Sequence, residues 1–152
     1  MTMLFMLCLL EPVRVGDIEI GVPKAETIRV LIRRPDRFPE FAGGSWLQIM
    51  LPLTNKNANR KAVCTQWLYT PKKARLTDDL DNEYKMYVLP EGAEFSWGID
   101  KEFRIPNDDT AYACLIFEAP IPKATKLTLE LSAENIGGKG KFKIVIPAAA
   151  WK

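Results

Sequence analysis

Histidine is absent from this chain of 152 residues. Its absence excludes Ser-His-Asp and Cys-His catalytic sites, together with every histidine-ligated metal site. It also removes the usual general base and the usual pH switch near neutrality. An enzyme built on this sequence would have to use carboxylates, Lys, Tyr or Cys, and no pair of carboxylates can be nominated for glycoside chemistry. We therefore expect a non-catalytic protein.

The chain also lacks a strong charge of either sign. It has 21 Lys and Arg against 19 Asp and Glu, a formal net charge of +2. Nucleic-acid binding would want a larger basic excess, so no nucleic-acid partner is predicted. Four arginines cluster near one expected strand end, and we interpret them as a solvated edge that discourages strand pairing. They are Arg29, Arg33, Arg34 and Arg37.

Cysteine is scarce, with three residues, Cys8, Cys64 and Cys114, and no C-x-x-C pair. A zinc site is therefore not expected. The odd number leaves at least one thiol free or paired between chains. Cysteine usage does not settle the redox compartment.

Long hydrophobic runs are missing except at the N-terminus, where residues 1–10 read MTMLFMLCLL. Ten residues are too few to span a bilayer. No Lys or Arg precedes the run, and Glu11-Pro12 follows it, which is unlike a signal peptide. Two interpretations stay open: the remnant of an export signal with a misplaced start, or a buried first strand. Membrane attachment would require an upstream signal or anchor.

What the sequence has in abundance is alternation of apolar and polar residues with a period of two. The clearest segments are SWLQIMLPLT, TKLTLELSA and KFKIVIP, whereas TAYACLIFE (residues 110–118) is apolar on both faces, as a central strand would be. A strand is also expected over residues 62–69 and another in ETIRVLIRR, while residues 89–103 look irregular. Pro52 cannot donate to a ladder, so its strand should meet an edge, a bulge or its end there. Seven to nine strands at this spacing predict one all-β domain over residues 11–152, a sandwich of two antiparallel sheets.

Several segments together resemble one family. SWLQIMLPLTNKN resembles an L-x-I-x-L-x-x-T-N strand, ARLTDDLDNEYKMY an L-x-D-x-x-x-N-x-Y hairpin, and IPNDDTAYACLIFEAP a polar turn that feeds a core strand. This layout, over residues 18–147, is similar to the uncharacterised bacterial immunoglobulin-like domains of exported proteins and lipoproteins. The resemblance implies an immunoglobulin-like sandwich that serves as a binding or structural module of an exported or envelope protein. It implies a protein partner and no particular site residues.

A rival pattern, DDTAYAC at residues 108–114, resembles the tyrosine corner of antibody-type domains, in which the cysteine bridges the two sheets. Cys64 would have to be the partner of Cys114. No Trp follows Cys64 at the expected distance, and Cys64 alternates away from Val63 and Trp67. We take the match as mostly coincidence and keep a Cys64–Cys114 disulfide as a minor hypothesis.

Two candidate sites stand out against simpler explanations. The acidic loop, residues 77–83 (TDDLDNE), could supply oxygen ligands to calcium. The EF-hand order and its glycine are missing, however, and a solvated turn explains the same residues. Its candidate ligands are Asp78, Asp79, Asp81, Asn82 and Glu83. Exposed aromatic side chains could stack on sugar rings, as in carbohydrate-binding sandwiches, whereas core packing is their simpler role. The candidates are Trp97, Trp46 and Tyr87.

The leading hypothesis is thus a non-catalytic module for protein–protein interaction, through a sheet edge or a loop end. The alternatives are a carbohydrate-binding module and a calcium-binding accessory domain.

Overall fold

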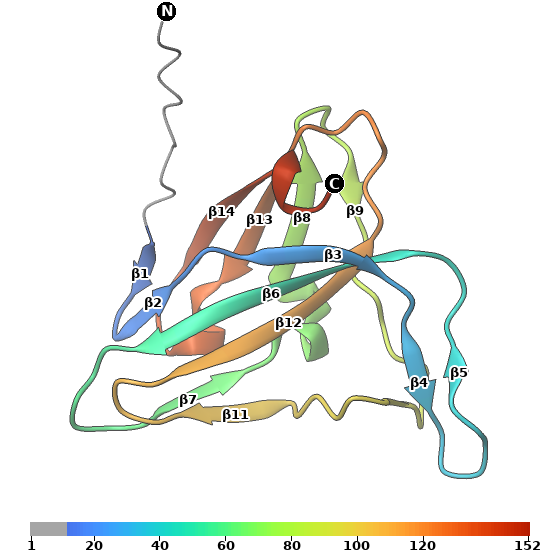
Figure 1. The fold of residues 1–152 in the computed structure, drawn as a ribbon. Helices are drawn as coiled ribbons and strands as arrows, with labels where there is room; N and C mark the ends of the chain where they lie inside the picture. The colour runs from blue at the N-terminus through green and yellow to red at the C-terminus, as the bar shows by residue number, and fades with distance from the viewer. Residues whose placement is uncertain (1–11) are drawn as a thin grey trace, which may run out of the picture.

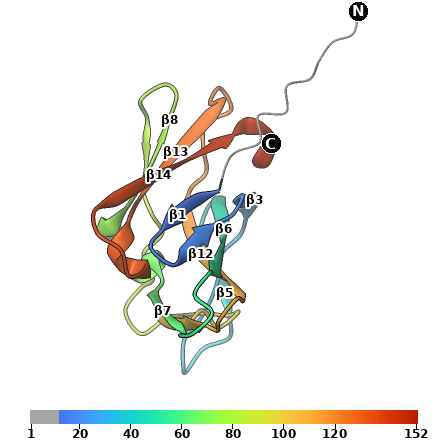
Figure 2. The same ribbon diagram turned by 90° about the vertical axis from the view of Figure 1, so that its left-hand side faces the viewer.

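The computed structural model describes residues 12–152 and contains two main antiparallel sheets (Figure 1). The five-stranded sheet is formed by β1 (Val13–Val15), β2 (Ile18–Ile20), β3 (Lys24–Ile28), β6 (Trp46–Asn55) and β12 (Thr110–Glu118). The four-stranded sheet is formed by β8 (Ala74–Asp78), β9 (Glu83–Tyr84), β13 (Lys126–Ser132) and β14 (Lys141–Pro147). The two sheets lie side by side in Figure 2. The predicted all-β sandwich is confirmed. Its two main sheets contain nine strands, but the described residues form fourteen strands in all, more than the seven to nine predicted.

Two smaller sheets were not expected. One has three strands, β4 (Leu31–Arg33), β5 (Glu40–Phe41) and β10 (Glu94–Phe95), and the other pairs β7 (Ala62–Thr65) with β11 (Glu102–Ile105). The helices of residues 12–152 are single 3₁₀ turns: η1 (Trp67–Tyr69), η2 (Pro71–Lys73), η3 (Ala133–Ile136) and η4 (Ala148–Ala150). No helix in this part of the chain is long and apolar enough to cross a membrane. The N-terminal run of residues 1–10 lies outside the described residues.

The pairing of β6 with β12 extends over nine residues of each strand and forms the centre of the five-stranded sheet. On its other side, β6 changes neighbour from β3, with Lys24 opposite Met50, to β2, with Ile20 opposite Leu53. Between these pairs, residues 21–23 face only Leu51 and Pro52, so one extra residue forms a bulge. Pro52 lies at this interruption, so its missing N–H does not remove a hydrogen bond from the pairing with β2 or β3. The predicted disturbance at Pro52 is therefore confirmed as a bulge.

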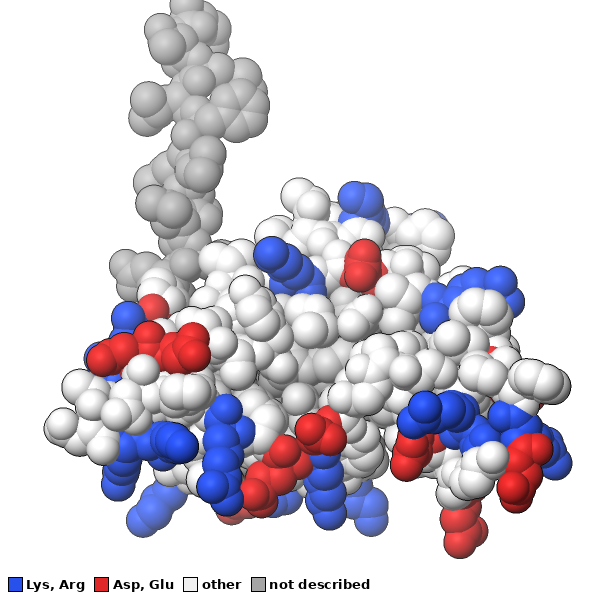
Figure 3. Space-filling view, turned by 60° about the horizontal axis from the view of Figure 1, so that its bottom comes forward, with Lys and Arg blue, Asp and Glu red and all other residues white. Residues whose placement is uncertain are grey.

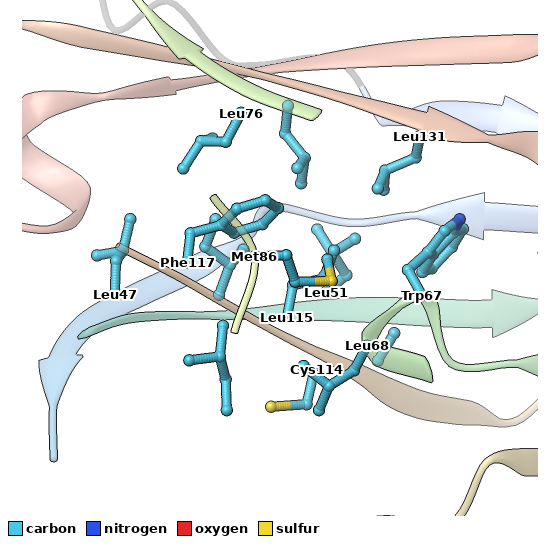
Figure 4. Packing of buried hydrophobic residues seen from close by; sticks show 14 of the residues in the cluster. Leu47, Leu51, Trp67, Leu68, Leu76, Met86, Cys114, Leu115, Phe117 and Leu131 are labelled. Carbon is cyan, nitrogen blue, oxygen red and sulfur yellow. The ribbon is translucent and has the colours of Figure 1, made fainter. Parts of the chain in front are cut away.

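The main core lies between the two sheets. Leu47, Ile49, Leu51 and Leu53 of β6 are fully buried, and so are Leu127, Leu129 and Leu131 of β13. Figure 4 shows Leu76 and Leu131 packed toward Leu51, Leu115 and Phe117, with Cys114 on the other side of the β6–β12 pair. Burial of each such side chain stabilises the fold by about 1.5–3 kcal/mol, because apolar surface leaves water.

The four-stranded sheet follows the expected alternation. In β14, Ile144 and Ile146 are buried, whereas Lys141, Lys143 and Val145 are exposed. The loop that follows η3 and leads into β14 lies close to β1. A Cβ added to Gly138 would lie 2.4 Å from Cγ1 of Val15, so only glycine fits this approach. This contact closes one end of the sandwich.

Two predicted strands were wrong in extent. The alternation in ETIRVLIRR does not belong to a single strand, because the chain leaves the five-stranded sheet after Ile28 and continues as β4 in the three-stranded sheet. The strand expected over residues 62–69 ends at Thr65, and Trp67 lies in η1. The indole Nε1 of Trp67 donates to the Ser132 carbonyl at 3.0 Å, so the ring fills the core from a helical turn instead of from a strand. The segment over residues 89–103, expected to be irregular, contains β10 and the start of β11.

Candidate functional site

On the outward face of the five-stranded sheet, β12 and part of β6 are covered by a third layer, residues 87–105, which carries a chain of aromatic contacts. The ring of Trp46, on β6, lies 4.9 Å from that of Tyr87, and Tyr87 lies 6.0 Å from Phe95 of β10. Phe95 in turn contacts Tyr69 and Trp97 at 6.5 and 5.3 Å between ring centroids. The Tyr69 hydroxyl donates to the Ile99 carbonyl. These contacts hold residues 87–99 against the sheet and bury the outward side chains of Cys114 and Ile116 on β12, while those of β6 stay half-buried.

The three aromatic candidates therefore gather in one cluster, but they do not form a flat stacking surface. Tyr87 is only 7% exposed, and its ring stands at 82° to that of Trp46. The Trp46 Nε1 donates to the Gly43 carbonyl at 2.9 Å, which fixes this ring as part of the packing. Trp97, at 42% exposed, is the one candidate of the three that is available to a ligand. The expectation of a platform that includes Trp46 and Tyr87 is wrong, because both rings are used to attach the third layer.

Trp97 borders a pocket of ≈ 300 Å³, which we call the outer pocket. It lies between the outward face of β6 and β12 on one side and residues 97–104 on the other. Its aromatic and sulfur-bearing walls are Trp97, Phe103, Tyr112, Met50 and Cys114, and its polar side chains are Gln48, Gln66, Asp100 and Arg104. Of these residues, the sequence analysis proposed only Trp97 as a ligand contact; it noted Cys114 for a disulfide instead. The apolar character of both faces of TAYACLIFE was the one signal that something covers β12.

Two glutamine side chains organise the floor of the outer pocket. Gln66 is 5% exposed, and its Oε1 accepts the Cys114 backbone N–H at 3.0 Å. The Gln48 Nε2 donates to Sδ of Met50 at 3.3 Å and lies 3.5 Å from Sγ of Cys114. Burial raises the pKa of the Cys114 thiol to about 11, although the hydrogen bond from Gln48 lowers it slightly. The thiol therefore stays protonated near neutral pH and is a poor nucleophile.

The edge of β12 that faces the outer pocket is only partly paired. The Cys114 N–H bonds to Gln66, and the Glu118 N–H donates to the Lys85 carbonyl at 2.9 Å. Alternate residues of an antiparallel strand direct their N–H and C=O groups to the same edge, so Tyr112 also directs its groups there. No hydrogen bond within residues 12–152 uses the Tyr112 N–H or carbonyl. The phenol ring of Tyr112 is 51% exposed beside these free groups.

The acidic loop is an internally bonded turn instead of a calcium site. Asp78 is 7% exposed, and its carboxylate accepts the Leu80 and Asn82 backbone N–H groups, the Asn82 side-chain amide and the Tyr84 hydroxyl. Burial alone would raise the pKa of Asp78, but the hydrogen bonds from Tyr84, Asn82 and Leu80 outweigh it and lower the pKa to about 2.

The other acidic candidates do not converge on a common point. Asp79 accepts the N–H groups of Thr125 and Lys126 and the Thr125 hydroxyl, and these bonds lower its pKa. Glu83 pairs with Arg75 at 3.1 Å, and Asp81 adopts a positive φ of 63° in the turn. Within residues 12–152 no three acidic, cysteine or histidine side chains are grouped to hold a metal ion. The calcium hypothesis is therefore wrong for this loop: Asp78 and Asp79 are occupied by protein donors, and calcium needs six or more oxygens.

The minor disulfide hypothesis is also wrong, since Cys64 and Cys114 are both free and buried. Cys64 lies on β7 opposite Phe103 of β11, whereas Cys114 lies on β12 opposite Met50 of β6. Burial raises the pKa of Cys64 to about 11 as well.

Charge is evenly mixed on the face shown in Figure 3, where Lys and Arg side chains alternate with Asp and Glu. The arginine group near β4 is likewise balanced by acidic or aromatic partners. Arg33 pairs with Glu94 at 3.1 Å and Arg34 with Glu40 at 3.2 Å, while Arg29 lies 4.2 Å from the centre of the Phe41 ring. This face therefore carries no field of one sign.

No protein-family model matches the chain, and no curated protein matches it. Among solved structures, the chain is similar to the yjhA protein from Bacillus subtilis, with a TM-score of 0.56 and 10% identity over 93% of this chain and 97% of that one. An uncharacterised β-sandwich protein from Clostridium difficile 630 gives a TM-score of 0.42 and 10% identity, over 91% of each chain. At this identity the first likeness extends to the fold alone. The resemblance to immunoglobulin-like domains of exported proteins stays a prediction.

Proposed function

We propose that this protein is a non-catalytic binding module for a protein partner and that the outer pocket is its binding site. The observation that carries the proposal is the backbone of Tyr112, which forms no hydrogen bond within residues 12–152, at the border of an aromatic pocket. An extended peptide residue can bond its own N–H and C=O groups to such a strand edge, as in β-strand addition, and place its side chain in the neighbouring pocket. The volume of ≈ 300 Å³ suits one or two side chains of a partner.

The lining of the outer pocket favours binding over catalysis. Its thiol has a raised pKa, and Asp100 is the one carboxylate that lines it. Glycoside hydrolysis needs two carboxylates that face each other across the substrate. Trp97 and Tyr112 supply large, partly exposed rings, which are the residue types that dominate binding energy in protein interfaces.

The test begins with a phage-displayed library of random hexapeptides selected on the full chain. Peptides that bind should lose at least tenfold in affinity on Trp97→Ala and on Tyr112→Ala. A second change, Tyr112→Pro, removes the unpaired N–H without breaking a bond inside the protein, so it should weaken binding further than Tyr112→Ala does. Val88, 65% exposed and outside the lining of the outer pocket, provides the control variant Val88→Ala.

Selected peptides that bind Trp97→Ala and Tyr112→Ala as tightly as the unmodified chain would overturn the proposal. Thermal melts of each variant establish that it is folded. Tyr112→Pro and Tyr112→Ala should both melt near the unmodified chain, since the side chain is half-exposed and its N–H has no partner to lose.

A carbohydrate ligand is the second candidate, because Trp97 and Tyr112 border side chains that can hydrogen-bond hydroxyl groups: Gln48, Gln66, Asp100 and Arg104. Stacking of a sugar on Trp97 needs the ring but not the Tyr112 N–H. A glycan array therefore separates the two functions. Glycan binding that is lost on Trp97→Ala and equal in Tyr112→Ala and Tyr112→Pro would favour the carbohydrate over the peptide.

The proposal extends to location. We propose that the module belongs to an exported or envelope protein, on the strength of its resemblance to such domains. Fractionation of the native cell with an antibody against the chain tests this, and recovery in the cytosol alone would contradict it.

A further inference from the structure

A second surface lies on the opposite side of the molecule from the small sheets, at the open side of the sandwich. Strand β14 pairs with β13 and, within residues 12–152, with no other strand, so one edge of this seven-residue strand is free. Lys141, Lys143 and Val145 direct their N–H and C=O groups to it, and Pro147 directs only a C=O. Figure 2 shows β14 and β1 at this side. A free edge of this length is a template for pairing with another strand.

An apolar groove of ≈ 210 Å³ lies directly beneath this edge. It is lined by Val13 of β1, Ile20 of β2 and Val22 of the connection to β3, and by residues 143–145 of β14. Val22 is 61% exposed and Val145 is 39% exposed. The free edge and the groove thus leave apolar surface in water at the same place, which is the usual sign of an interaction surface.

The lysines of β14 would ordinarily guard such an edge, because charged side chains discourage strand pairing. Here both are drawn toward β13. The Nζ of Lys141 lies 3.2 Å from one carboxylate oxygen of Glu130, and the Nζ of Lys143 lies 3.8 Å from the other. The carboxylate of Glu130 is shared between them, and its pKa is lowered chiefly by the hydrogen bond from Lys141. The repulsion that an incoming strand would meet is therefore reduced.

The sequence of β14 is complementary to itself in one antiparallel register. If two copies pair with Ile144 opposite Ile144, then Lys143 of each copy lies opposite Val145 of the other. Lys141 lies opposite Pro147, and Phe142 lies opposite Ile146. In this register no two lysines face each other. The inward-facing side chains of both copies, Phe142, Ile144 and Ile146, form one apolar row that extends over both grooves.

We propose that a second copy of this chain pairs along β14, so that the two four-stranded sheets join into one and each groove is covered by the partner's inward-facing side chains. The interface is isologous, since the same seven residues serve both copies. It lies on β14 and the groove below it, whereas the outer pocket lies beyond β12, so it does not depend on the function proposed above.

The register predicts opposite effects for two substitutions at one position. Val145→Lys would place two lysine side chains opposite each other at two points of the interface, because the new side chain of each copy would face Lys143 of the other. Val145→Glu would instead create two cross-strand ion pairs with the same lysines. We expect sedimentation velocity on the full chain at micromolar to millimolar concentrations to show a reversible monomer–dimer equilibrium. The dissociation constant should rise at least fivefold in Val145→Lys and fall at least twofold in Val145→Glu.

The same two substitutions at Val88, which is exposed on another side, serve as matched controls and should leave the equilibrium unchanged. A chain that stays monomeric up to millimolar concentration, whichever residue stands at 145, would overturn the proposal. So would a dimer whose dissociation constant shifts in the same direction in both Val145 variants, because a specific register requires opposite signs. Reduction of all samples excludes dimers formed through cysteine.

Discussion

On the outward side of the five-stranded sheet, Cys114 and Ile116 of β12 are 3% and 0% exposed, whereas on the outward side of the four-stranded sheet Lys141, Lys143 and Val145 of β14 face solvent. The two sheets share the core that lies between them. Only the five-stranded sheet has further buried side chains on its outward side. The difference lies in the segment over residues 87–105, which packs aromatic side chains onto β6 and β12 and stops short of the other sheet. The covered face contains the outer pocket, and the uncovered sheet retains a free edge.

The largest effect should come from the covered face. Ile116→Ala removes a fully buried side chain between β12 and the third layer, so it should lower the free energy of unfolding by about 2–5 kcal/mol, as Leu129→Ala should in the main core. Thr128→Ala, on the open face of β13, is the control and should change it by less than about 0.5 kcal/mol. Urea denaturation measures all three. A loss below about 1 kcal/mol for Ile116→Ala would mean that the third layer is not packed on the sheet.

An intermediate effect should come from the Asp78 turn, which orders the end of the four-stranded sheet. Asp78→Asn removes the charged acceptor of four hydrogen bonds, and we expect it to lower stability at neutral pH. Because the folded pKa of Asp78, about 2, lies below the ordinary value, the carboxylate contributes stability above about pH 4 and loses it as the pH falls toward 2.

The difference in stability between the unmodified chain and Asp78→Asn should therefore be constant from about pH 7 to about pH 4 and shrink below it. Urea midpoints measured at steps of pH give this curve. A difference that stays constant down to about pH 2 would contradict the assignment of the pKa to Asp78. Asp81→Asn, in the same turn but without these bonds, is the matched control.

The smallest effect should come from the open face. Glu130→Gln removes the carboxylate shared by Lys141 and Lys143, both of which are largely exposed. We expect a loss of less than about 1 kcal/mol in monomer stability, which added salt should reduce further. A loss as large as that of Ile116→Ala would mean that this face is organised by charge, contrary to the comparison of the two sheets.

The sequence predicted the parts of the fold that depend on local alternation. The positions of β13 and β14 were predicted correctly because one face of each strand is exposed to solvent, so polar and apolar residues alternate regularly along it. The apolar second face of β12 indicated burial without saying what covers it, since Tyr87, Phe95 and Trp97 reach it from a segment with little periodicity of its own. The break after Ile28 was missed because β3 and β4 continue the same alternation into two different sheets.

The candidate sites were harder to predict, for a related reason. Asp78 and Asp79 looked like ligands because a sequence does not show where backbone N–H groups point, and those groups occupy both carboxylates. Trp97 was identified by its place in an irregular segment. Gln66 and Tyr112 shape the outer pocket, but the sequence did not point to either as a ligand contact. Gln66 belongs to no motif, and Tyr112 was noticed only in DDTAYAC, which suggests a tyrosine corner and not an open strand edge.

The central claim is that β12 is a covered strand whose outer edge is open at Tyr112, next to the outer pocket. Amide hydrogen exchange followed by NMR tests it directly. We predict that the amides of Ala113, Leu115 and Phe117, which bond to β6, exchange slowly and near the global unfolding limit, while the Tyr112 amide exchanges orders of magnitude faster. A Tyr112 amide as strongly protected as its neighbours would show that the edge is closed and would contradict the account.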